Sequence, residues 1–277
     1  MTSLLGSEIY NKPVLRVGNI SLSFHQASAA VVQRIIERFG YDVETKQAPH
    51  EMMFKIHEKG DVDFLVSAWL PSSHEVYLNR YLEDIEQLGV LYEPYCIWGV
   101  PNYVPIGMVD SVEDLLKPEV ADRMTKLIQG IGAGAGISRF SRQMIQVYGL
   151  DQRGYYFENG TEEECFAAFD QAVAKGKWAI VPLWHPQFLH EMYPIRELKE
   201  PKGLLGIQDQ ATLIVRKETL PLVSENLIQV LRDLHLGNAA VTRMDYYINK
   251  KGMSPLEAAD TWMEENQEKT LKWFSRL

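Results

Sequence analysis

The chain contains only two cysteines among its 277 residues, and it has no long run of basic or of apolar residues. Cys96 and Cys165 lack the paired spacing of a redox or zinc motif, so we expect two small buried or half-buried thiols. With a net charge of -9 and no basic stripe, the chain is a poor candidate for binding nucleic acid. No window reaches the ~18 to 20 continuous apolar residues that a membrane-spanning helix requires.

Two further features are missing. Residues 1–13 lack the basic region and the apolar segment of a secretion signal. We therefore expect a periplasmic or membrane-associated extracytoplasmic protein if a signal has been trimmed, and a cytoplasmic protein otherwise. No Gly/Ser-rich linker separates the two halves of the chain, which favours halves joined by extended crossing strands over halves joined by a flexible tether.

Short apolar runs alternate with amphipathic segments along most of the chain. Residues 14–17 and 64–68 are typical of buried strands, and 27–39 is typical of a helix with one apolar face. The pattern returns with a strand predicted over 126–131 and a helix over 137–148. Strands separated by helices of this length predict an α/β fold with two doubly wound lobes.

The candidate crossing strands divide the chain into lobes. If 97–104 and 208–214 pass between the lobes, the first lobe is discontinuous and consists of 1–102 plus 210–277, including a helical tail. The second lobe is then 103–209. We expect the ligand cleft between the two lobes.

Three tryptophans share one local setting near the ends of predicted strands. Trp69, Trp98 and Trp184 are each followed by a proline within three residues. Open α/β sheets bind ligands beyond the carboxyl ends of their strands, and a proline ends the strand and leaves the indole at the rim. Indole faces attract a methylated cation with about 0.5 to 2 kcal/mol for each contact. The alternative for each tryptophan is a large core residue, and we interpret the other three tryptophans as packing.

Three segments resemble signature segments of the glycine betaine/choline-type substrate-binding proteins of ABC importers. They are FLVSAWLPSSH at 64–74, IGAGAGI at 131–137 and VPLWHP at 181–186, and LKEPKG at 198–203 is similar to the segment that follows the last tryptophan. A Trp-Leu-Pro segment and a Trp-x-Pro segment thus bracket a glycine-rich helix start. The resemblance extends over 14–262.

The resemblance implies a periplasmic binding protein-like fold of type II, whose two hinged lobes close on a quaternary-ammonium solute. Trp69, Trp98 and Trp184 would be the cage walls. The membrane subunits of an ABC importer would be the partners, and the protein would act as a monomer without cofactor or metal.

The sequence departs from the family pattern at two places. Relatives often have an aromatic residue in the first strand-to-helix loop, where this chain has Leu22; Phe24 or His25 are the candidate substitutes. Relatives also tend to have a histidine directly after the proline of the last tryptophan segment. Here Gln187 holds that position, and His185 precedes the proline. The contact to an anionic group of the ligand therefore stays open, and with it the choice among betaines, choline, carnitine and a sulfonium analogue.

An anionic group on the ligand would need hydrogen-bond donors. The glycine-rich segment leads into a predicted helix whose first turn contains Gly136, Ile137 and Ser138, and backbone N–H groups at a helix N-terminus bind anions. The loop 18–25 leads into another helix and is an equal candidate. The alternative is that the glycines only form a tight turn.

The sequence leaves three alternative functions to be considered. Residues 130–135 match the dinucleotide-binding pattern G-x-G-x-x-A, with Asp151 about twenty positions further on. A hydrolase or metal enzyme would use His74, His185 and His190, but their spacing fits no zinc motif and no serine or cysteine elbow accompanies them. A ligand sensor with the same fold is the third. The sequence predicts no enzyme activity.

Overall fold

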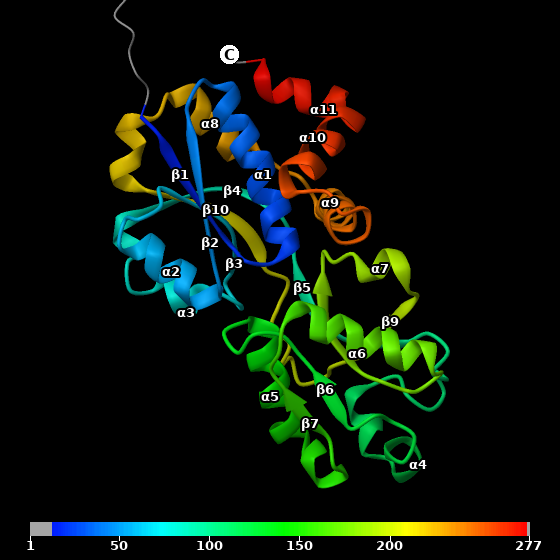
Figure 1. The fold of residues 1–277 in the computed structure, drawn as a ribbon. Helices are drawn as coiled ribbons and strands as arrows, with labels where there is room; N and C mark the ends of the chain where they lie inside the picture. Colours follow the sequence, from blue (N-terminus) through cyan, green and yellow to red (C-terminus); the bar gives the residue numbers. More distant parts are fainter. Residues whose placement is uncertain (1–12, 276–277) are drawn as a thin grey trace, which may run out of the picture.

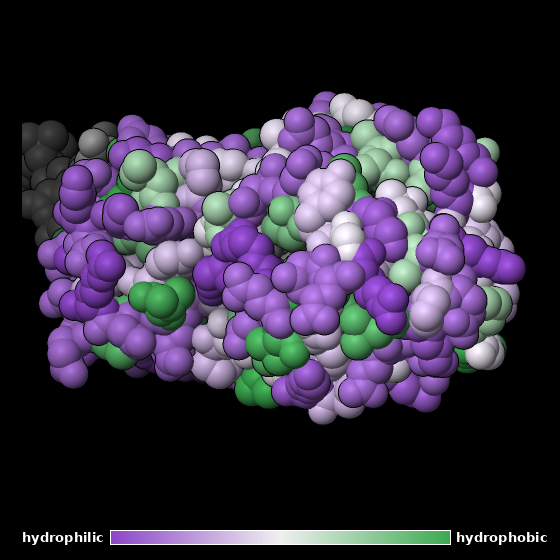
Figure 2. Space-filling view, turned by 90° about the horizontal axis from the view of Figure 1, so that it is seen from below, coloured by the Kyte–Doolittle hydropathy of each residue, from purple (hydrophilic) through white to green (hydrophobic). Residues whose placement is uncertain are grey.

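The computed structural model describes residues 13–275, which form two α/β lobes lying end to end (Figure 1). The predicted two-lobed α/β class is confirmed, although both lobes contain antiparallel as well as parallel strand pairs. Seen from below, the surface is mostly hydrophilic and its hydrophobic residues stand in small separate spots (Figure 2). Among the described residues, no helix has both the length and the apolar character needed to cross a bilayer.

The first lobe is built on a five-stranded sheet with the order β2-β1-β3-β10-β4. β1 is parallel to β2 and β3, whereas β10 is antiparallel to β3 and β4. The strands are β1 (Leu15–Ile20), β2 (Val43–Ala48), β3 (Phe64–Leu70), β4 (Ile85–Tyr92) and β10 (Gln210–Arg216). The sheet therefore combines strands from both ends of the chain, as the prediction of a discontinuous lobe requires.

Helices cover both faces of this sheet. Phe64 and Val66 of β3 belong to the same core as α1, whereas Leu65 belongs to the core formed with α2, because successive side chains of a strand point to opposite faces. α1 also packs against α9 and α10. The helices of this lobe are α1 (Ser23–Arg38), α2 (His50–Glu58), α3 (Glu75–Leu78), α8 (Glu225–Asp233), α9 (Asn238–Lys251), α10 (Pro255–Glu265) and α11 (Gln267–Thr270).

The second lobe has two small sheets. An antiparallel sheet has the order β8-β5-β9, and β6 pairs with β7 in parallel. The strands are β5 (Tyr95–Pro101), β6 (Leu127–Gln129), β7 (Tyr156–Glu158), β8 (Val181–His185) and β9 (Ile195–Glu197). The helices are α4 (Pro118–Ala121), α5 (Gly136–Tyr148), α6 (Glu162–Ala174) and α7 (Leu189–Met192). The predicted strand and helix around 126–148 are thus present as β6 and α5.

The chain crosses between the lobes earlier than the sequence indicated. All of β5 pairs within the second sheet, so the expected crossing at 97–104 is wrong, and the crossing lies at Glu93 and Pro94 between β4 and β5. The returning chain passes at Asp209, whose backbone N–H donates to the Pro94 carbonyl over 2.7 Å. The lobe limits at 102 and 103 stay a proposal, and the pairing of β5 favours a boundary near Pro94.

Candidate functional site

A small, largely closed cavity with room for about 10 Å³ of water lies where the two lobes meet. Its walls come from the ends of strands and the first turns of helices, which is where α/β sheets bind ligands. The first lobe contributes Leu22, Phe24, His25, His50, Trp69, Ser73 and His74, and the second contributes Cys96, Ile131, Ala135, Gly136, Ile137 and Trp184. Seven of the sequence-predicted site residues are therefore brought together here.

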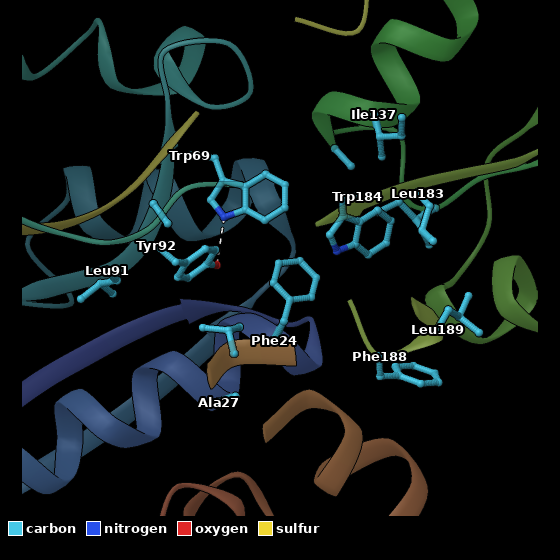
Figure 3. Packing of buried hydrophobic residues seen from close by; sticks show 14 of the residues in the cluster. Phe24, Ala27, Trp69, Leu91, Tyr92, Ile137, Leu183, Trp184, Phe188 and Leu189 are labelled. Atoms are coloured by element: carbon cyan, nitrogen blue, oxygen red, sulfur yellow. Dashed lines mark hydrogen bonds between the residues drawn. The ribbon is translucent and has the colours of Figure 1, made fainter. Parts of the chain in front are cut away.

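Three aromatic rings from three different elements converge on this cavity (Figure 3). Phe24 of α1 lies between Trp69 of β3 and Trp184 of β8, with ring centroids 5.4 Å and 5.5 Å apart. The three side chains are no more than 5% exposed. The rings are tilted at 38° and 51° and pack in contact, and all three line the cavity.

A chain of hydrogen bonds holds the Trp69 indole in place. Its Nε1–H donates to the Tyr92 hydroxyl over 3.0 Å, and that hydroxyl lies 2.5 Å from Ser67 Oγ (Figure 3). Ser67 Oγ lies 2.8 Å from His25 Nδ1. Because an indole N–H can only donate, the Tyr92 hydroxyl can donate its own proton to Ser67 Oγ. The Ser67 hydroxyl can then donate to His25 Nδ1. In that arrangement the remaining proton of the His25 ring is on Nε2.

Ser67 has a backbone conformation that side-chain-bearing residues rarely adopt. Its φ is +67°, and it is the only non-glycine residue of the described chain with a positive φ. Such a conformation costs about 1 to 3 kcal/mol and persists where the surroundings hold it, often at functional sites. Here the hydroxyl contacts to Tyr92 and His25 hold Ser67 in place. The strained residue lies two positions before Trp69 and so helps to set where that indole is aimed.

Three histidines surround the base of Trp69. The ring centroids of His25, His50 and His74 are 5.5 to 6.4 Å apart. His74 Nδ1 accepts the backbone N–H of Trp69 over 2.9 Å, so the proton of a neutral His74 ring is on Nε2. Burial lowers the pKa of all three, that of His50 to about 4, and their mutual repulsion lowers the pKa of His25 and His74 further. The rings are therefore neutral near pH 7.

The resulting cavity is uncharged but carries N–H donors. None of its lining residues is Asp, Glu, Lys or Arg. Trp184 is 1% exposed, and its Nε1–H has no hydrogen-bond partner among the described residues. The first turn of α5 also presents backbone N–H groups at Gly136 and Ile137, because a helix leaves its first N–H groups unpaired. A buried unpaired donor costs about 1 to 3 kcal/mol, so these groups favour a ligand that can accept hydrogen bonds.

The lobes are closed on one another at the side of the cavity near α3. The Tyr77 hydroxyl donates to the Gly134 carbonyl over 2.7 Å, and Arg139 donates to the Ser73 carbonyl over 2.5 Å. Gly136 comes so close to Ser73 that a methyl group on Gly136 would lie 2.9 Å from the Ser73 Cβ. The glycine is required here because two backbones from different lobes approach one another directly.

Trp98 lies outside the cavity, contrary to the prediction. Its indole is fully buried in the second lobe and donates to Ser141 Oγ over 2.8 Å. Cys96, on the same face of β5, lines the cavity instead. Two residues of a strand span about 6.6 Å, which carries Trp98 past the cavity and under α5.

Three other predicted residues are also placed elsewhere. Ser138 donates to the Ile131 carbonyl over 3.0 Å and thereby closes the turn before α5. His185 stacks on His190 with centroids 3.6 Å apart, outside the cavity. Gln187 is buried, and its Oε1 accepts the Leu189 N–H over 2.5 Å. These side chains support local turns of the second lobe.

The predicted binding site did not include His50, Ser73, His74, Cys96, Ile131 or Ala135, although His74 was considered for a hydrolase. His50 begins α2 directly after β2, a parallel neighbour of β1. The strand-end rule that singled out the tryptophans would have found it. His74 is the last residue of the 64–74 segment and folds back on Trp69, which only the turn after β3 reveals. Among the described residues, no group of three His, Cys, Asp or Glu side chains has the arrangement to hold a metal ion.

Two α/β lobes joined by two crossing segments are the fold of a solved glycine betaine-binding protein, and the family model that matches this chain describes a substrate-binding domain rather than an enzyme. Residues 13–265 match the family described as the substrate binding domain of ABC-type glycine betaine transport systems. The chain belongs to this family, OpuAC. The glycine-rich segment 130–135 therefore belongs to a solute-binding lobe, and the interpretation as a dinucleotide-binding enzyme is set aside.

Individual relatives agree with this assignment. The glycine betaine/carnitine transport binding protein GbuC of Listeria monocytogenes serotype 1/2a (strain 10403S) is 26% identical over 157 residues, which are 57% of this chain and 52% of GbuC. The match thus spans about half the length of that protein.

Solved structures match over nearly the whole chain. Lactococcal OpuAC, in its closed-liganded conformation with glycine betaine, is 25% identical with a TM-score of 0.83 and covers 95% of this chain and 100% of its own. The glycine/betaine/L-proline-binding protein ProX of Borrelia burgdorferi shows the same fold, with a TM-score of 0.82, 24% identity and coverage of 94% and 96%.

Proposed function

We propose that this protein is the solute-binding component of an ABC importer and captures a zwitterionic quaternary-ammonium solute of the glycine betaine type. Phe24, Trp69 and Trp184 would form the cage for the cation. The single observation that carries the proposal is the convergence of these three rings, from both lobes, on an uncharged cavity.

The cation would be recognised by ring faces alone. A trimethylammonium group has no N–H to donate, so a carboxylate offers it no hydrogen bond, whereas aromatic faces attract its spread charge. The cavity has no acidic side chain among its lining residues, which fits this mode. Phe24, which with His25 was a candidate for the missing first-loop aromatic at Leu22, would supply the third ring of the cage, and Trp98 would not belong to it.

The anionic end of the ligand would be bound by neutral donors. Trp184 Nε1 has no partner, and the Nε2–H groups of His25 and His74 are the free donors of rings that line the same cavity. The N-terminus of α5 adds backbone donors and a partial positive charge. A carboxylate would satisfy several of these groups, whereas the single hydroxyl of choline would satisfy fewer. We therefore favour a betaine over choline.

Capture would proceed by closing the lobes. The first lobe holds Phe24 and Trp69, where a solute would bind first, and closure would bring Trp184 across. The ligand shifts the equilibrium toward the closed form only by its differential affinity for that form. Contacts such as Tyr77 with Gly134 would then hold the lobes together.

Titration calorimetry with three ligands tests the proposal. Glycine betaine should bind. 3,3-Dimethylbutanoate has the same shape and the same carboxylate but a carbon in place of the charged nitrogen, and it should bind at least tenfold more weakly. Choline keeps the cation and lacks the carboxylate, so it should also bind more weakly than glycine betaine. Equal affinity for glycine betaine and the uncharged-carbon analogue would overturn the aromatic cage.

The importer role would place the protein outside the cytoplasm, beside the membrane subunits of the transporter. The family description supports this role. Fractionation of native cells tests it, since a mature protein found only in the cytosol would remove the importer role and leave the ligand sensor.

A further inference from the structure

A second buried cluster joins the lobes at α9 and the start of α6. Asp245 of α9, in the first lobe, is fully buried. Its Oδ2 accepts the backbone N–H of Phe188, which belongs to the second lobe, over 2.8 Å. Its Oδ1 accepts from Asn249 Nδ2 over 3.0 Å, and the same amide group donates to Ser23 Oγ over 2.9 Å. One carboxyl group is thus shared between elements of both lobes.

Glu162, the first residue of α6 in the second lobe, reaches the same cluster. Ser23, at the start of α1, lies close enough to this carboxyl group for its N–H and its hydroxyl to lower the pKa of Glu162. The Ser23 hydroxyl also lowers the pKa of Asp245, so one serine of the first lobe acts on both carboxyl groups. The Glu162 Oε1 atom is enclosed and has no partner among the described residues.

Among the described residues, no cation forms an ion pair or a hydrogen bond with either carboxyl group. The titratable groups that face them are Glu163 from α6, the Cys165 thiol and the Tyr92 hydroxyl. The Lys250 ammonium lies over the Phe188 ring, 5.0 Å from its centroid. Burial raises the pKa of Asp245 to about 7, and burial together with the charge of Asp245 raises the pKa of Glu162 well above its usual range.

We propose that closure of the lobes takes up a proton that is held by the Glu162 and Asp245 pair, so that these two residues set the pH dependence of solute binding. The inference rests on the proposed capture of a solute by lobe closure. Glu162 and Asp245 belong to different lobes, and opening would separate them and return both to water. The enclosed Glu162 Oε1, which has no donor to accept from, is the atom best suited to hold the added proton.

The direction of the effect follows from the two states. In the open form both carboxyl groups would titrate near the ordinary value of about 4. In the closed form their pKa values are higher, that of Asp245 about 7, so closing binds protons in the interval between these values. Solute affinity is therefore highest in acid and falls as the pH rises through 7, by up to about tenfold per pH unit for one proton.

The cavity histidines do not produce the same effect. Burial lowers their pKa in the closed form, that of His50 to about 4, so in that form they are neutral across the interval from pH 5.5 to 8.5 that we propose to test. A group whose pKa is lowered by closure would release a proton instead of taking one up. The sign of the proton exchange thus separates the carboxyl pair from the histidines.

Calorimetric titration of the unmodified protein with glycine betaine, between pH 5.5 and 8.5, measures this exchange directly. Repeating each titration in buffers with different heats of ionisation gives the number of protons bound with the ligand. We expect uptake approaching one proton near pH 6 and an affinity at least tenfold lower at pH 8 than at pH 6. Binding without proton uptake, or with release, overturns the inference and leaves the proposed function standing. Absence of binding at every pH overturns both.

Two variants then test whether Glu162 and Asp245 hold the proton that is taken up. Glu162→Gln puts a neutral amide in place of the protonated carboxyl and should abolish the uptake and flatten the pH profile, and Asp245→Asn should do the same. The matched control is Glu225→Gln, an exposed acidic residue that begins α8 as Glu162 begins α6, and it should keep the uptake of the unmodified protein. Thermal unfolding identifies a variant that does not fold. Proton uptake that persists in a folded Glu162→Gln protein overturns the assignment.

Discussion

The two tryptophan walls of the cavity differ in how they are held. Trp69 is fixed within its own lobe, because its indole N–H donates to Tyr92 and its backbone N–H donates to His74. Trp184 is equally buried, but its indole N–H has no partner. The first wall is thus complete before any ligand arrives, whereas the second wall keeps a donor free. In the proposed function, that donor is satisfied when the lobes close on a solute that carries an acceptor.

This difference assigns separate tasks to the two lobes. The Trp69 side chain is already fixed by its hydrogen bonds, so it loses little conformational entropy when a ligand binds. The first lobe therefore offers a preorganised surface to the cation. A wall with an unpaired buried donor gains more from a ligand that can accept a hydrogen bond, so the second lobe adds selectivity. The predictions below test this division, from the largest expected effect to the smallest.

Removing either ring should have the largest effect. Trp69→Ala and Trp184→Ala should each weaken glycine betaine binding by about 2 kcal/mol or more, roughly 30-fold, because each removes one aromatic face from a closed cage. Titration calorimetry measures the change. Trp184→Phe keeps a ring but loses the N–H, and should reduce the affinity for glycine betaine more than that for choline. Equal losses for both ligands would refute the role of the Trp184 donor.

Blocking the approach of the lobes should come next. Gly136→Ala places a methyl group against Ser73 of the other lobe and should weaken binding by about 1 to 3 kcal/mol, a typical cost of overpacking. The matched control is Gly132→Ala in the same loop, where an added methyl group meets nothing within 4 Å. Calorimetry should show a loss for the first variant and none for the second. Similar affinities for the two variants would contradict the need for close approach at Gly136.

Breaking the support of Trp69 should reduce stability. Tyr92→Phe leaves the indole N–H of Trp69 without its acceptor and Ser67 without one of its two partners. We expect the free energy of unfolding to fall by about 1 to 3 kcal/mol, the usual cost of a buried unpaired group. Denaturant unfolding measures it. An unchanged midpoint and slope would show that the hydrogen-bonded chain contributes nothing to the first wall.

The smallest effect on affinity is expected at Trp98. Trp98→Phe removes the hydrogen bond to Ser141 at a residue that does not line the cavity. The affinity for glycine betaine should stay within about twofold, while the free energy of unfolding falls by about 1 kcal/mol. A loss of affinity comparable to that of Trp184→Ala would return Trp98 to the binding site.

Much of the fold could be predicted from local patterns. The helix predicted over 27–39 is present as α1, because its apolar residues recur every three to four positions and bury one face. It begins earlier, at Ser23, where no side-chain cap marks the start. The sequence analysis placed the first crossing between the lobes at the wrong residues. β5 is apolar along its length, and its own sequence does not show that it pairs with β8 and β9. Extended segments that pair in either lobe have the same composition.

The three tryptophans show where sequence alone reaches its limit. Trp69, Trp98 and Trp184 share one local signature, a large ring near the end of an apolar run with a proline soon after. That signature determines that the rings are buried in strands, because burial is a local property. It placed Trp69 and Trp184 correctly near the ends of β3 and β8, but Trp98 lies in the middle of β5. Which rings face each other across the lobes depends on the register of strands that are distant in the sequence. The tertiary structure alone decided that Trp69 and Trp184 meet beside Phe24 while Trp98 packs under α5, since a displacement of two residues along a strand moves a side chain by about 6.6 Å.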